Sequence, residues 1–193
     1  MKKLSKKWKI FITTVVILIG GLYGYYKSNN RNAFEEMYNS FYNILPLSSV
    51  ARMPQVEDQT ERDIRPLNYK SNTNKEKIEI TLVNFSDRKK VSITSASYIS
   101  EGVYLDVTYM YEVDTCKLIN YVSFRGENVP IVEDDQKQTK ELLEKYNISK
   151  EYLQEKSDKL LDTVLTDWKN YSFSSYSKDN MGRLIIEKDE FLR

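Results

Sequence analysis

The side chains that could do chemistry in this sequence are one thiol and a few carboxylates, because the chain contains no histidine. Without histidine it lacks the commonest general base and the commonest transition-metal ligand of proteins. Cys116 is the sole cysteine, so it cannot form an internal disulfide, and the sequence offers no histidine to activate it as a nucleophile. We interpret Cys116 as a structural thiol at the start of a strand.

The carboxylates allow two weak hypotheses. The run Glu133-Asp134-Asp135 could bind calcium, but it lacks the alternating oxygen ligands and the glycine of an EF-hand loop, so a solvated helix start is the favoured interpretation. Asp106 could form an acid pair with Glu112 or Glu79 across neighbouring strands. No phosphate-binding loop, dinucleotide-binding motif or zinc-protease motif is present. The sequence therefore predicts a protein that is not an enzyme and has no cofactor, no catalytic residue and no metal site.

The charge distribution is uneven along the chain. Six of the 29 basic residues lie before residue 28, which leaves 23 basic against 28 acidic residues after it, a formal charge of −5. An acidic domain argues against a nucleic-acid partner, whose phosphates need a basic surface. It favours a basic protein surface or a cation as the partner.

A membrane anchor is predicted near the N-terminus. Residues 10–26 are uncharged and mostly apolar, at the short end of what crosses a bilayer as a helix. Five lysines precede this stretch and tyrosines end it, so the positive-inside rule places the N-terminus in the cytoplasm. A cleaved signal peptide is the alternative, although the residues after the apolar core are bulky where a cleavage site needs small ones. We expect residues 1–27 to be a single-pass anchor of the cell membrane and residues 28–193 to form one extracellular domain, with a polar linker at 28–31.

The domain is predicted to begin with a helix over residues 33–45, capped by Asn32 and by Glu35 in a capping box. One face of this helix is rich in aromatic residues, which we interpret as core rather than as a ligand groove. Its apolar positions are Phe34, Met37, Tyr38, Phe41, Tyr42 and Leu45. Residues 47–75 show no regular period and are expected to form a long loop.

Alternation with a period of two predicts four strands joined by short turns, at residues 77–83, 91–99, 103–113 and 116–125. Such strands form an antiparallel meander. Helical patterns follow at residues 133–146 and 150–170, the second capped by Ser149, and residues 171–187 are expected to form a C-terminal hairpin. The apolar stripe of the second helix comprises Tyr152, Leu153, Leu160, Leu161, Val164, Leu165 and Trp168. The predicted fold class is α+β, an antiparallel β-meander packed against helices.

The strand at residues 103–113 defines the candidate binding site. One face carries Val103, Leu105, Val107, Tyr109, Tyr111 and Val113, and is expected to lie under the helices. The other face is expected to be solvated and to contact a protein partner, because tyrosine is enriched in interface hot spots. The predicted contact residues are Tyr104, Asp106, Met110 and Glu112, with Tyr121 from the next strand. The alternative is that the 15 tyrosines only fill a core and its edges.

The overall layout resembles the TipC family of streptococcal immunity proteins. The resemblance rests on the basic N-terminus, the single anchor, the aromatic helix, the meander and the closing segment with Trp168, Tyr171, Asn180 and Gly182. Members protect the producing cell against an LXG toxin of the type VII secretion system, which attacks the lipid-linked peptidoglycan precursor outside the membrane. The resemblance implies a binding protein that blocks a secreted toxin there, and it transfers no functional residue.

Two further hypotheses remain open at this point. The chain could be an accessory or structural subunit of an envelope secretion or conjugation machine, in which the anchor itself contacts partners. It could also be an envelope hydrolase that uses a carboxylate pair.

Overall fold

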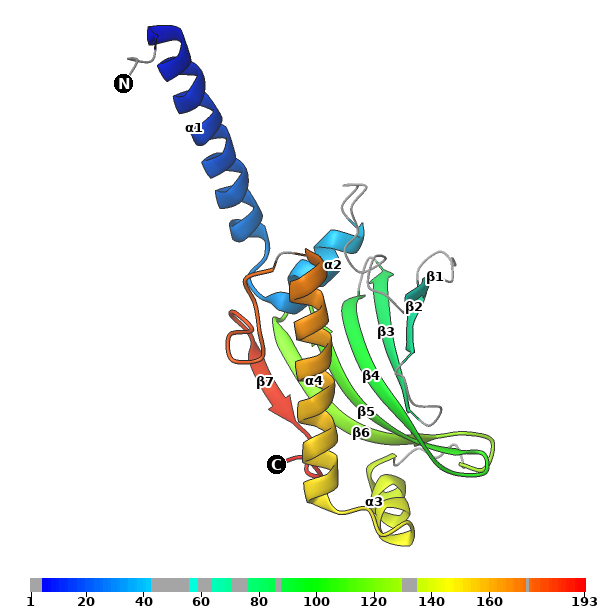
Figure 1. Ribbon diagram of the computed structural model, residues 1–193. Coiled ribbons are helices and arrows are strands. Elements are labelled where there is room, and N and C mark those ends of the chain that lie inside the picture. The colour runs from blue at the N-terminus through cyan, green and yellow to red at the C-terminus, as the bar shows by residue number, and fades with distance from the viewer. Residues whose placement is uncertain are drawn as a thin grey trace.

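The computed structural model describes residues 5–42, 56–58, 64–70, 76–85, 88–129, 135–172 and 174–193. It has an α+β fold in which a long N-terminal helix projects from a curved sheet that carries helices on one face (Figure 1). The predicted fold class is therefore confirmed.

Helix α1 (Lys6–Asn29) contains the predicted anchor and is longer than the apolar stretch at both ends. Ser5 caps it, since the Ser5 side chain accepts a hydrogen bond from the backbone N of Trp8. The segment Lys6–Tyr25 of this helix is long and apolar enough to cross a membrane, and none of it is buried against the rest of the protein. An apolar helix at this position is also compatible with a signal sequence.

Helix α2 (Ala33–Tyr42) follows α1 after three residues. Asn32 caps it as predicted, because Asn32 Oδ1 accepts a hydrogen bond from the backbone N of Glu35 at 2.9 Å. Glu35 reaches back to the backbone N of Arg31 at 2.8 Å, one residue earlier than a capping box requires. The polar linker predicted at 28–31 is wrong, because α1 continues to Asn29 and Asn30 is buried in the domain.

The sheet has seven strands in the order β1-β2-β3-β4-β5-β6-β7. The four predicted strands are confirmed as β3 (Glu76–Phe85), β4 (Arg88–Ser100), β5 (Val103–Glu112) and β6 (Lys117–Arg125), each antiparallel to its neighbour. Two more strands, β1 (Val56–Asp58) and β2 (Ile64–Lys70), extend the meander beyond β3. The loop predicted at 47–75 is therefore wrong at these two strands, and its other residues lie outside the described ones. Sequence alternation missed them because pairing with β3, a tertiary interaction, determines the strand state here.

Strand β7 (Ile185–Lys188) lies where a C-terminal strand was predicted, but it pairs in parallel with β6. The reason is the connection: α3 (Asp135–Lys145) and α4 (Lys150–Ser172) return the chain to the start of β6, as a parallel pair requires. The C-terminal hairpin predicted at 171–187 is wrong as a pair of strands, because Tyr171 and Ser172 still belong to α4 and β7 pairs with β6 instead. An antiparallel bridge between Ser177 and Asn180 lies near the predicted turn.

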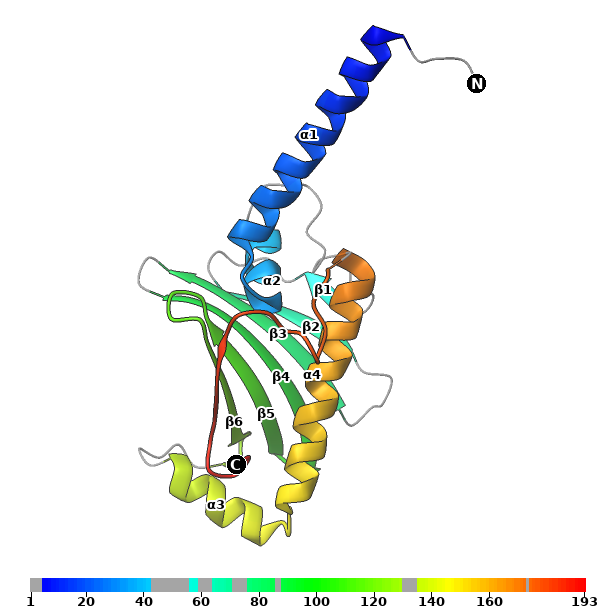
Figure 2. The ribbon, with the colours of Figure 1, turned by 90° about the vertical axis from the view of Figure 1, so that its left-hand side faces the viewer.

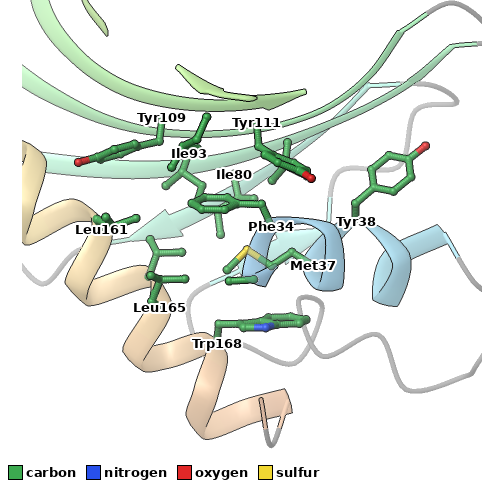
Figure 3. Packing of buried hydrophobic residues seen from close by; sticks show 14 of the residues in the cluster. Phe34, Met37, Tyr38, Ile80, Ile93, Tyr109, Tyr111, Leu161, Leu165 and Trp168 are labelled. Atoms are coloured by element: carbon green, nitrogen blue, oxygen red, sulfur yellow. The ribbon is translucent and has the colours of Figure 1, made fainter. Parts of the chain in front are cut away.

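Helices α2 and α4 cover one face of the sheet, and α3 lies at the end of the sheet away from α1 (Figure 2). Ser149 caps α4, accepting a hydrogen bond from the backbone N of Tyr152 at 3.2 Å. The core under α2 and α4 joins Phe34 and Met37 to Trp168 and to buried residues of the sheet (Figure 3). These positions confirm that the aromatic stripe of α2 is core, although the side chains of its last residues, Phe41, Tyr42 and Leu45, lie outside the described ones.

A second core cluster lies toward α3 and contains Val103, Leu105 and Val107 of β5 with Leu143, Leu153 and the C-terminal Leu192. The apolar face of β5 thus contributes to both clusters, as its alternation predicts. Tyr152 departs from the predicted stripe of α4, because its side chain is 40% exposed.

Candidate functional site

The five predicted contact residues lie together on the face of the sheet that is turned away from α2 and α4, which we call the open face. Alternation along β5 places Tyr104, Asp106, Met110 and Glu112 there, since the residues between them enter the core. Tyr121 of β6 pairs with Thr108 of β5 and so shares this face. The register therefore makes one continuous surface from residues that the sequence could only assign strand by strand.

The end of the open face away from α1 is aromatic. Tyr98 of β4 pairs with Tyr104 of β5, and their rings meet edge to face with centroids 5.8 Å apart. Both side chains remain exposed, 47% for Tyr98 and 40% for Tyr104. The guanidinium of Arg125 lies 5.9 Å from the centre of the Tyr104 ring, which adds a cation–π contact. Two neighbouring rings held in this way offer rigid apolar area with polar edges.

Beside this pair lies a small ion cluster. Arg125 Nε is 2.7 Å from Asp106 Oδ2, and Arg125 Nη2 is 3.6 Å from Glu79 Oε1. Burial raises the pKa of Asp106, and the charge and hydrogen bond of Arg125 offset only part of that effect. Burial alone would lower the pKa of Arg125, but the neighbouring carboxylates of Asp106 and Glu79 reverse this and raise it. In this cluster the charge of Arg125 is thus shared by the carboxylates of Asp106 and Glu79, which therefore do not form an exposed acid pair.

Asp106 departs from the expectation of a solvated side chain. The residue is only 7% exposed, and among the described residues its Oδ1 atom is buried without a hydrogen-bond partner. Thr108 is also buried, and its hydroxyl lies 3.0 Å from that of Thr94 on β4. Asp106 and Thr108 therefore make the centre of the open face closely packed, and the exposed side chains of Tyr98, Tyr104 and Arg125 lie toward the end away from α1.

The end of the open face near α1 carries a second ion pair. Lys90 Nζ of β4 is 3.0 Å from Glu112 Oε1 and 3.7 Å from the sulfur of Met110. The hydrogen bond from Lys90 lowers the pKa of Glu112, and a hydrogen bond from Thr115 adds to this. Asp106 and Glu112 consequently lie at different places along β5 with different cations, and they do not form the acid pair that was considered.

Sequence analysis missed three contributors to this surface, namely Tyr98, Arg125 and Lys90. Tyr98 and Arg125 lie on strands that had been predicted, whereas Lys90 lies one residue before the strand predicted at 91–99, because β4 begins earlier, at Arg88. All three share the open face by alternation. What could not be read from the sequence is the register that sets Tyr98 opposite Tyr104 and Lys90 opposite Glu112.

The described residues do not support a reactive thiol at Cys116 or a metal site, the other chemical hypotheses. Cys116 lies in a turn with a positive φ of 56°, and its sulfur is 3.9 Å from the carbonyl oxygen of Val113, which suits a structural thiol. Glu133 and Asp134 lie outside the described residues, and Asp135 begins α3. Within the described part of the chain, no three His, Cys, Asp or Glu residues are grouped in a way that could hold a metal ion.

Comparison with known proteins gives matches of two kinds. A family model described as TipC immunity protein-like matches residues 5–189. Among solved structures, the chain is similar to TipC2 from Streptococcus intermedius B196, with a TM-score of 0.73 and 20% sequence identity over 83% of this chain and 97% of that chain. At this identity the structural likeness shows a shared fold. No curated protein matches the sequence.

Proposed function

This chain belongs to the TipC immunity protein-like family, and from that premise we propose that it is a membrane-anchored immunity protein that binds and neutralises a secreted antibacterial toxin outside the cell. The protein acts by binding rather than by catalysis. The family resemblance predicted from the sequence is confirmed, while the toxin, the binding face and the anchor are parts of this proposal.

The open face is the observation that carries the proposal. It combines two exposed tyrosines with ion pairs that are already formed in the free protein, at Arg125 with Asp106 and at Lys90 with Glu112. Tyrosines held by neighbours lose little conformational entropy when a partner covers them, which is the property of interface hot spots. Preformed ion pairs likewise reduce the number of side chains that binding must order.

We assign different roles to the five predicted residues in light of their burial. Tyr104 is the anchoring contact, because it is the most exposed of them and forms a ring pair with Tyr98. Asp106 holds Arg125 in place, and Glu112 holds Lys90. Met110 and Tyr121, which are half-buried, complete the surface between the two ends. Long-range attraction of a basic partner comes from the acidic balance of the whole domain.

The location follows from α1. Its uncharged stretch at residues 10–26 is preceded by lysines and ends in tyrosines, so we propose a single crossing with the N-terminus in the cytoplasm and the sheet outside. This orientation places the open face where a secreted toxin arrives.

The first experiment captures the partner and then tests the face. The full chain in detergent is incubated with proteins exported by the same strain, and the retained toxin is identified by mass spectrometry. Its affinity is then measured for Tyr104→Ala and for Tyr152→Ala, a matched control since both tyrosines are 40% exposed and Tyr152 lies on α4. A hot-spot tyrosine contributes about 2 kcal/mol, so Tyr104→Ala should weaken binding roughly 30-fold.

The control variant should bind as the wild type does. Equal affinities for the two variants would exclude Tyr104 as the anchoring contact. Recovery of envelope-machine components instead of a toxin would favour the accessory-subunit hypothesis.

An anchor replacement separates these two functions further. An immunity protein needs only display outside the membrane, so exchanging residues 1–27 for an unrelated single-pass anchor should preserve protection against the toxin. Loss of protection by a chain that is still displayed at the surface would show that the anchor itself makes functional contacts, as a machine subunit requires.

A further inference from the structure

The junction between the anchor helix and the domain contains only Asn30, Arg31 and Asn32. Asn30 is 5% exposed and Asn32 is fully buried, although both have polar side chains. The amide of Asn39 on α2 donates a 2.8 Å hydrogen bond to Asn30 Oδ1. A flexible tether would leave such residues in solvent, so their burial shows that this segment is part of the folded domain.

The C-terminal part of the chain holds the junction through its backbone. The N–H of Arg183 donates to the carbonyl of Arg31 at 2.8 Å, and the N–H of Ala33 donates to the carbonyl of Met181 at 3.0 Å. The hydroxyl of Tyr176 donates to the carbonyl of Asn30 at 2.6 Å. Consecutive junction residues are thus bound to residues 176–183, which come from the opposite end of the sequence.

The junction is also bound to the sheet. Asn32 Nδ2 donates to the hydroxyl of Tyr111 on β5 at 2.7 Å and to the carbonyl of Arg183 at 3.1 Å. The guanidinium of Arg31 lies 3.3 Å from the carbonyl oxygen of Val113. The same junction residues therefore contact the strand that carries the open face.

Close approach at this point depends on Gly182. Its φ of +91° is one that other residues rarely adopt, and a Cβ added there would lie 2.5 Å from the carbonyl oxygen of Arg31 and 2.7 Å from the Cα of Asn32. A side chain at this position would push the two segments apart. Gly24 in α1 is a natural comparison, because a Cβ there meets nothing within 4 Å.

We propose that residues 176–183 form a clamp that joins the anchor helix rigidly to the domain, so that α1 and the sheet reorient as one body and the open face keeps a fixed angle to the membrane. The statement about the membrane rests on the proposed function. The rigid joint itself concerns only this chain and can be tested without a bilayer or a toxin.

A distance measurement on the full chain tests the clamp. In a Cys116→Ser background, spin labels are placed by Leu22→Cys on α1 and Asp162→Cys on α4, both of which have exposed side chains. Pulsed dipolar spectroscopy in detergent micelles then gives the distribution of distances between the two labels. A variant with three glycines inserted after Asn29 serves as the hinged reference, since such an insertion lets its ends separate by roughly 10 Å.

The expected result is a single narrow distribution for the wild type and for Gly24→Ala, and a broad one for the insertion variant. Gly182→Ala should broaden the distribution toward that of the insertion. Tyr176→Phe, which keeps the ring and removes one hydrogen bond, should broaden it less. Circular dichroism of each variant shows whether the domain remains folded.

Two results would overturn the inference: a wild-type distribution as broad as that of the insertion variant, or a folded Gly182→Ala variant with the wild-type width. If Gly182→Ala does not fold, the comparison of the wild type with the insertion variant still shows whether the junction is rigid. A narrow wild-type distribution together with failure to capture any toxin would leave the clamp standing and refute the proposed function, so the two failures are distinguishable.

Discussion

Replacing Trp168 by phenylalanine should destabilise the domain strongly, because the indole both fills the core and satisfies a buried carboxylate. Trp168 is fully buried between α4 and α2 (Figure 3). Its Nε1 donates a 2.7 Å hydrogen bond to Glu36 Oε2. Glu36 is itself buried, and Ser174 also donates to the same oxygen. Phenylalanine keeps one ring but removes the N–H donor.

The magnitude combines two contributions. Leaving a buried carboxylate short of one donor costs about 2 kcal/mol. The smaller ring leaves part of the site unfilled, which adds about 1 kcal/mol. A loss of about 3 kcal/mol corresponds to a decrease in Tm of roughly 6 to 12 °C for a domain of this size.

Thermal unfolding followed by circular dichroism on the full chain in detergent measures this effect. Trp8→Phe is the matched control, because the same change is made at a tryptophan that is 60% exposed on α1 and whose ring meets that of Phe11. The control should shift Tm by no more than a degree or so, roughly 0.5 kcal/mol or less. Equal shifts for the two variants would refute the assigned role of Trp168.

Three further predictions concern other polar groups that are buried or half-buried. Burial raises the pKa of Asp106 in the folded state, so ionisation of this side chain lowers the free energy of unfolding of the wild type as pH rises through that pKa. Asp106→Asn cannot ionise, so its Tm relative to that of the wild type should increase from pH 4 to pH 7. A Tm difference that stays constant over this range would contradict a raised pKa. Asp189→Ala removes the acceptor for the backbone N of Val122 at 2.8 Å and should cost about 1 to 2 kcal/mol, with faster hydrogen exchange at Val122 in β6 and unchanged exchange in α2. Asn32→Ala removes the cap that accepts from Glu35 N and should cost about 1 kcal/mol or more in denaturant unfolding. Asn32→Ser retains a capping oxygen without burying a charge and should recover part of the loss, and no recovery would mean that capping is not the main role of Asn32.

Several features of this protein were predictable because they depend on local pattern. Alternation along β5 identified which residues enter the core and which lie on the open face, since side chains of a strand point to opposite sides in turn. Asn32 and Ser149 were identified as helix caps from their type and position alone. The apolar span of α1 and the lysines before it were equally visible in the sequence.

The candidate site was only partly predictable. All five predicted residues share one face, but the sequence could not show that Asp106 is buried under Arg125, because that depends on which strand lies beside β5 and in which register. Tyr98 and Lys90 were missed for the same reason. Register is determined by pairing over the whole sheet, and a strand pattern by itself leaves it open.

By itself, then, the sequence determined the helices and central strands, the caps, the acidic balance after residue 27 and the apolar span of α1, because each can be read from residues close together in the chain. Only the tertiary structure decided that β1 and β2 extend the sheet, that β7 pairs in parallel with β6, and that residues 30–32 are bound to residues 176–183. These features join segments that are far apart in the sequence. Their free energy comes from backbone pairing and burial that exist only once the chain has folded, so no local pattern records them.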